Sequence, residues 1–124
     1  MYKRQNNKVS LEFRIEGEKK HLKVNWPSFH DGRGIAAEIT LQHSAAHESM
    51  NIIIPIGEKR FYDNTKINCM PARGFIQYGD IREELTPTST LGSLDWGRGV
   101  WEYQSFWNWA SASGFSMALS AKAR

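Results

Sequence analysis

The sequence has no apolar run long enough to cross a bilayer. Its longest candidate, Ile52–Ile56, is interrupted by Pro55 and falls far short of the roughly 20 apolar residues that a membrane-spanning helix needs. The basic and polar segment 1–10 has no apolar stretch behind it, so we expect no secretory signal. These absences predict a protein without an integral membrane segment, retained in the cytoplasm unless an upstream segment has been removed.

Cysteine is nearly absent, because Cys69 is the only one. The chain therefore has no internal disulfide, and we interpret Cys69 as a small buried residue without a redox partner. Metal-ligand patterns are lacking as well. His43 and His47 would share a face only if their connector were helical, and two imidazoles do not complete a zinc site. We expect no metal and no cofactor.

Net positive charge is confined to the N-terminal segment. Residues 1–24 hold seven Lys or Arg against three Glu, and the remainder is nearly neutral. No nucleic-acid motif accompanies this basic strip, so we interpret it as the solvated face of a strand rather than a phosphate-binding surface. Glycine-rich phosphate loops and serine-nucleophile elbows are also missing. Neither nucleic-acid binding nor serine-hydrolase chemistry is therefore predicted.

What the sequence does have is hydrophobic alternation with a period of two. Apolar side chains take every second position in four segments, Val9–Ile15, Leu22–Trp26, Ile35–Leu41 and Met50–Ile56. This pattern is typical of half-buried strands. Gly17 and Glu18 predict a hairpin turn between the first two strands, and Pro27 is expected to end the second. The connector 42–49 is interpreted as a loop.

Turn residues divide the next part of the chain into shorter segments. Asp63–Asn64, Pro71 and Gly74 separate three candidate strands, Arg60–Tyr62, Lys66–Met70 and Phe75–Tyr78. Thr86–Ser93 is rich in turn formers and predicts a loop. Many short strands, tight turns and no helix longer than about three turns predict a single all-β domain over residues 1–124. Its expected form is an antiparallel barrel, a partial barrel or a sandwich.

Four of the five tryptophans lie between Leu94 and Gly114. If Val100–Ala110 is a strand, its alternate positions place most of the aromatic side chains on one face. These rings either fill the core of a small β domain or line an apolar cavity. The second interpretation gives five candidate ligand-binding residues: Trp96, Trp101, Tyr103, Trp107 and Trp109.

Asp95 and Arg98 flank Trp96 and Gly97 in what we expect to be a tight loop. A carboxylate and a guanidinium at this spacing can form an ion pair, or the aspartate can accept hydrogen bonds from the turn backbone. Alternatively, Asp95 lies at a cavity mouth as a general acid or base, with its pKa tuned by burial and by Arg98. Asp95 and Arg98 are therefore the candidate catalytic residues.

Two segments, NTKINCMPARG at 64–74 and LDWGRGVW at 94–101, resemble the bacterial domain of unknown function 2804 family. The resemblance is carried by Lys66, Asn68, Met70, Pro71, Gly74, Asp95, Trp96, Gly97, Arg98, Gly99 and Trp101. It implies a longer protein of which this chain is an internal fragment. It also implies a lipocalin-like fold, distantly similar to carotenoid hydratase relatives, and hence a cavity for an apolar molecule.

These observations leave three functions open. The first is a binding module that holds a hydrophobic small molecule or lipid in a β-barrel cavity lined by tryptophans. The second is an enzyme with hydratase- or isomerase-like chemistry, in which Asp95 moves a proton on an apolar substrate. The third is a structural fragment without activity. Sheet edges left without flanking strands would pair with a second copy, so we also expect self-association.

Overall fold

The computed structural model describes residues 2–5, 8–104, 106 and 108–115, and within them all regular structure is β. The eight strands are β1 (Tyr2–Gln5), β2 (Ser10–Glu16), β3 (Lys19–His30), β4 (Arg33–Gln42), β5 (Ser49–Ile56), β6 (Arg60–Tyr78), β7 (Ile81–Leu85) and β8 (Leu91–Val100). Every strand pairing is antiparallel. The all-β prediction is confirmed.

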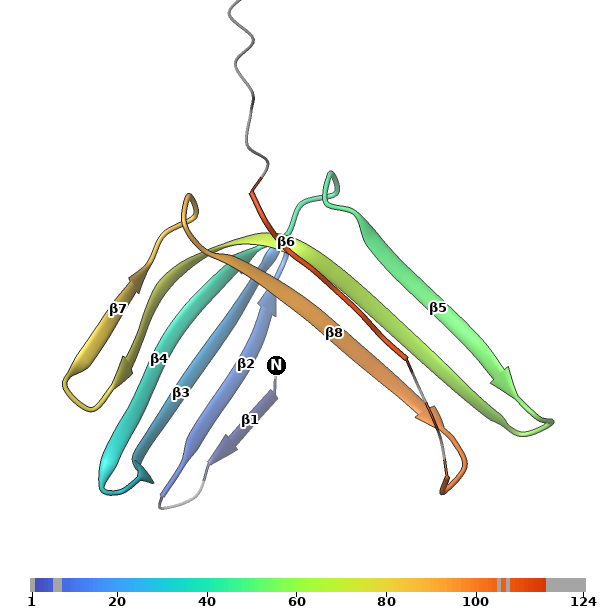
Figure 1. The fold of residues 1–124 in the computed structure, drawn as a ribbon, viewed down its shortest axis with the longest axis horizontal. Coiled ribbons are helices and arrows are strands. Elements are labelled where there is room, and N and C mark those ends of the chain that lie inside the picture. The colour runs from blue at the N-terminus through green and yellow to red at the C-terminus, as the bar shows by residue number, and fades with distance from the viewer. Residues whose placement is uncertain (1, 6–7, 105, 107, 116–124) are drawn as a thin grey trace, which may run out of the picture.

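The strands form two sheets that share β6. The first sheet has the order β1-β2-β3-β4-β6-β7, and the second has the order β5-β6-β8. Figure 1 shows the sheets as two arms of an inverted V, with β6 running over the apex from one arm to the other. In the part of the chain that the structure describes, the outer strands of each sheet do not meet. The arrangement is a partial barrel or open sandwich rather than a closed barrel.

The first sheet has one apolar face and one polar face. Register places Phe13 opposite Leu22, and Leu22 opposite Ile39, so the alternation in sequence becomes a continuous apolar row across three strands. On the other face, Lys23 forms an ion pair with Glu38 across the same two strands at 2.5 Å. The amphipathic pattern of the sequence therefore fixes which side of this sheet packs.

The core lies where the two sheets meet. It consists of Leu41, Ile67, Met70 and Ala72, with Leu22, Ile39 and Leu94 packed against it. The pairing of β6 with β8 shifts register between Ile67 and Met70, and Cys69 within that interval has a φ of 56°. This bulge bends β6, which lets side chains from both of its halves enter one core.

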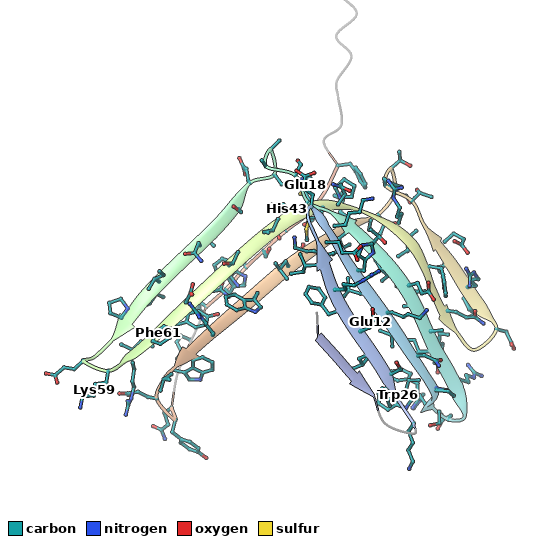
Figure 2. All side chains as sticks on the ribbon, turned by 180° about the vertical axis from the view of Figure 1, so that it is seen from behind. Glu12, Glu18, Trp26, His43, Lys59 and Phe61 are labelled. Carbon is teal, nitrogen blue, oxygen red and sulfur yellow. The ribbon has the colours of Figure 1, made fainter. Side chains whose placement is uncertain are left out.

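A second contact at the apex joins two connectors. The backbone N–H of His43, after β4, donates to the carbonyl oxygen of Glu18 in the β2–β3 turn at 2.7 Å. Figure 2 labels both residues at the apex, far from Lys59 and Phe61 at the free end of the second sheet. The apex is thus held by a hydrogen bond as well as by the apolar core.

The predicted hairpin around Gly17 and Glu18 and the strands between Val9 and Ile56 are confirmed, with one correction at Pro27. β3 continues past Pro27 to His30, with a register shift against β4 after Trp26. Asp31 and Gly32 then form the two-residue turn that starts β4, both with positive φ. The connector after β4 contains turns and no helix, as expected. No helix in the described ranges could span a membrane.

Three predictions about the second half of the chain are wrong. The candidate strands between Arg60 and Tyr78 are one strand, because Asn64 and Pro71 lie within β6. The loop predicted over Thr86–Ser93 ends earlier, because β8 begins at Leu91. Asp95 and Arg98 lie within β8 rather than in a tight loop. The glycines of β8 misled that prediction. At Gly99 a Cβ would lie 2.3 Å from the Phe61 carbonyl oxygen, so glycine there permits close strand approach.

The strand predicted at Val100–Ala110 is also wrong. β8 ends at Val100, and the described residues from Trp101 to Phe115 have no regular structure. The alternating aromatic side chains satisfied the period-two pattern, but a strand also needs a neighbour for its backbone groups. Instead, the chain turns back after β8 and runs alongside β6 and β8 (Figure 1).

Candidate pocket on the second sheet

A pocket of about 340 Å³ lies on one face of the second sheet. Its lining residues are Ile52 and Ile54 of β5, Tyr62, Asn64 and Lys66 of β6, Asp95 of β8, and Asn108 and Trp109 beyond β8. The strand residues share this face because register pairs Ile52 with Asn64 and Lys66 with Asp95, while successive side chains alternate between faces. The pocket is therefore built from the sheet and from the chain that returns over it.

Asn64 and Lys66 form a polar centre with Asp95. Asn64 is 1% exposed, and its amide nitrogen donates to Asp95 Oδ1 at 2.8 Å and to the Trp96 carbonyl oxygen at 2.9 Å. The Lys66 ammonium donates to Asp95 Oδ2. The Lys66 side chain is 10% exposed, whereas that of Asp95 is 57% exposed. A nearly buried cation is thus neutralised by a carboxylate at the pocket rim.

The returning segment closes over this centre. We call residues 108–113 the strap. The Trp109 ring lies over Lys66, with Nζ 4.0 Å from the ring centroid, in a cation–π contact. Ser111 donates to Asn68 Oδ1 at 3.0 Å, and Ser113 Oγ accepts from the Cys69 backbone N–H at 3.2 Å. These hydrogen bonds attach the strap to β6 through serine side chains.

Asp95 is ionised at neutral pH. The hydrogen bond from Lys66, followed by that from Asn64, lowers the pKa of the Asp95 carboxyl below its ordinary value. A carboxyl group whose pKa is lowered holds no proton to give near pH 7, so it is poorly suited to act as a general acid. The same environment suits Asp95 to hold Lys66 in place.

The predicted ion pair between Asp95 and Arg98 is absent. Residues three apart in a strand lie on opposite faces, and Arg98 Nε instead pairs with Asp63 Oδ2 at 3.1 Å. The two candidate catalytic residues therefore do not share a site. Only Asp95 lines the pocket.

The five candidate ligand-binding aromatic residues are dispersed. Trp109 lines the pocket, and Trp101 packs edge-on against the pocket residue Tyr62, with ring centroids 5.8 Å apart. Trp96 lies on the opposite face of β8, near Arg98. Tyr103 is fully exposed, and Trp107 lies outside the described residues.

Asn64 and Lys66 are pocket residues that the sequence interpretation missed. Asn64 was assigned to a turn, and Lys66 to a short strand without a site, because polar side chains on a buried face break the apolar alternation. The spacing of these residues in the sequence was the signal that could have placed them on one face of a strand. Tyr62, Asn64 and Lys66 continue a period of two through β6.

The other polar clusters among the described residues have weaker features of a binding site than this pocket. A wider groove of about 570 Å³ on the first sheet is lined by charged residues, of which Lys23 pairs with Glu38 and Arg14 with Glu12. His47 accepts from the Ser44 backbone N–H at 2.8 Å and so stabilises its own turn. Among the described residues, no group of three His, Cys, Asp or Glu is placed to hold a metal ion.

Comparison with known proteins gives one family match. The model of a family described as a domain of unknown function (DUF2804) matches residues 1–120, which is almost the whole chain. The match includes every strand and the strap. Neither the curated proteins nor the solved structures gave a match.

Proposed function

The chain belongs to the domain of unknown function 2804 family, whose description gives no activity, so we propose a function from the pocket. We propose that the protein binds a hydrophobic small molecule or lipid between the second sheet and the strap. The observation that carries this proposal is the pocket's composition. Ile52, Ile54 and Trp109 give it apolar walls around one compact polar centre. Ligand pockets have this character, with mostly apolar linings and few placed polar groups.

The lipocalin-like resemblance adds to the proposal. Lipocalin barrels hold apolar molecules against inward-facing side chains. In the described part of this chain the sheets stay open, so the tryptophan of the strap takes the place of a facing barrel wall. The pocket volume of about 340 Å³ is at the lower end of the usual range for small-molecule sites, about 300–1,000 Å³. A compact ligand, or one end of a longer one, fits this volume.

The enzymatic alternative rests on Asp95 alone. With its pKa lowered by Lys66 and Asn64, Asp95 would take a proton rather than give one, and Arg98 lies on the other face of the strand. A base that is already hydrogen-bonded to a cation is weak. We therefore rank binding above acid–base catalysis.

A titration with a neutral fluorescent apolar dye, 1-N-phenylnaphthylamine, tests the proposal. Two adjacent isoleucines of β5 provide a matched pair of variants, since Ile54 lines the pocket and Ile53 points to the opposite face and is 68% exposed. We expect Ile54→Glu to weaken dye binding at least tenfold, about the effect of placing a charge in an apolar wall. Ile53→Glu should bind like the unmodified chain.

Circular dichroism checks that both variants keep their strand content. The proposal is wrong if the dye shows no saturable binding to the unmodified chain. It is equally wrong if the two variants weaken binding to the same extent, because the dye would then sit on a general apolar surface rather than in the pocket.

A further inference from the structure

The side-chain oxygen of Asn64 is the least satisfied polar atom in the pocket wall. Both hydrogens of the Asn64 amide have acceptors, Asp95 Oδ1 and the Trp96 carbonyl oxygen, and these fix which way the amide points. Oδ1 is buried and has no hydrogen-bond partner among the described residues. Buried acceptors are nearly always paired, so an unpaired one in a pocket wall is suited to a ligand that carries a hydrogen-bond donor.

The charges beside Asn64 cancel. Lys66 and Asp95 form an ion pair within the same wall, and Arg98 with Asp63 forms another on the far face. A ligand carboxylate would compete with Asp95 for Lys66, and a ligand ammonium would compete with Lys66 for Asp95. A ligand ammonium would leave Lys66, whose side chain is 10% exposed, without its partner charge, which is costly. A ligand carboxylate gains little, because Lys66 is already paired with Asp95. The wall therefore favours an uncharged head group.

Lys66 supplies a donor next to the Asn64 acceptor. The two residues are two apart on β6 and therefore lie on the same face. An ammonium has three N–H donors, of which Asp95 uses one. A single group that both donates and accepts can be bound by Asn64 and Lys66 together, and an alcohol hydroxyl is the simplest neutral group with both capacities.

We propose that the pocket is specific for a neutral alcohol, an apolar molecule whose hydroxyl donates to Asn64 Oδ1 and accepts from Lys66 while its hydrocarbon lies along Ile52, Ile54 and Trp109. This inference rests on the proposed function. Because Oδ1 is buried, part of the pocket wall has to shift as the hydroxyl enters, and the strap is the part attached without strand pairing. The serine side chains that hold the strap make this movement possible without breaking a strand pairing.

Four decyl compounds that differ only in head group test the inference: 1-decanol, decyl methyl ether, decanoate and decylammonium. Each is used to displace 1-N-phenylnaphthylamine from the unmodified chain. We expect decanol to bind at least about tenfold more tightly than the other three, the factor given by one well-made hydrogen bond to a charged or buried group. The ether is the sharpest comparison, since it accepts but cannot donate.

The variant Asp95→Asn tests the charge argument separately. It keeps the shape of the side chain, which is 57% exposed, but leaves Lys66 without a counter-charge. We expect the preference of this variant to move toward decanoate by at least tenfold relative to decanol. Arg98→Leu, on the opposite face, should keep the order of the unmodified chain.

The outcomes separate the two proposals. Equal affinity for all four compounds would preserve the apolar-ligand function and overturn the alcohol inference, with water then satisfying Asn64. A preference for decanoate or decylammonium in the unmodified chain would also overturn it. If neither the dye nor any decyl compound binds, both proposals fail.

Discussion

In β8, Asp95 pairs with Lys66 and Arg98 pairs with Asp63, whereas the spacing in sequence suggested a pair of Asp95 with Arg98. Asp95 should be energetically coupled to Lys66 rather than to Arg98. Hydrogen bonds to charged groups contribute about 1.5–3 kcal/mol when they are well buried. The Lys66 side chain is 10% exposed but that of Asp95 is 57% exposed, so solvent screening reduces the expected coupling to about 1–2 kcal/mol.

A double-mutant cycle in urea measures this coupling. The variants are Lys66→Met, Asp95→Asn and their combination, and the free energy of unfolding is compared for all four chains. A second cycle with Asp95→Asn and Arg98→Leu is the control, since the two side chains lie on opposite faces of β8. We expect the control coupling to be within about 0.5 kcal/mol of zero, as for residues that do not touch.

The reasoning is refuted by the reverse ranking. That result would be a coupling energy above about 1 kcal/mol between Asp95 and Arg98 and none between Asp95 and Lys66. Asp95 and Arg98 would then share a loop, as their spacing in sequence suggests. The assignment of Asp95 to the pocket would then be wrong as well.

Two further predictions concern acid and association. Since the folded state lowers the pKa of Asp95, its contribution to stability is present above the ordinary value of 3.8 and is lost as the pH falls through the lower folded value. Urea melts between pH 5 and pH 2 should therefore show a smaller loss for Asp95→Asn than for the unmodified chain, and an equal loss would contradict the shift. β5 pairs only with β6 in the described chain, and its Ile53 is 68% exposed. We expect dimers or larger species in sedimentation that Ile53→Lys reduces, whereas a monomer at high concentration would show that this edge is protected.

The sequence predicts the first sheet well because one simple rule governs it. From Val9 to Leu41, apolar and polar side chains alternate along β2, β3 and β4, and each strand buries one face only. The second sheet follows a different rule. Its pocket face holds Asn64 and Lys66, whose burial depends on Asp95 about thirty positions further along the chain. No local pattern encodes such a partner.

The candidate site shows the same division. Asp95 and Trp109 were identified from the sequence, and both line the pocket. Arg98 and Trp96 were grouped with them because a loop brings sequence neighbours together. In the strand β8, Trp96 and Arg98 lie on the face opposite Asp95, so the wrong secondary-structure assignment grouped residues that lie on two sides of the sheet.

The shared strand β6 has a consequence for how the chain folds. Strands β2, β3 and β4 are joined by two-residue turns, so each pairs with a neighbour that is close to it in sequence. Among the described strands, β5, β7 and β8 each pair with β6 and with no other strand. β6 also pairs with β4 and with β8, neither of which is its neighbour in sequence, so placing β6 is a longer-range and slower step than forming the hairpins of β2, β3 and β4. Substitutions within β6 should slow folding more than equally destabilising substitutions in β2.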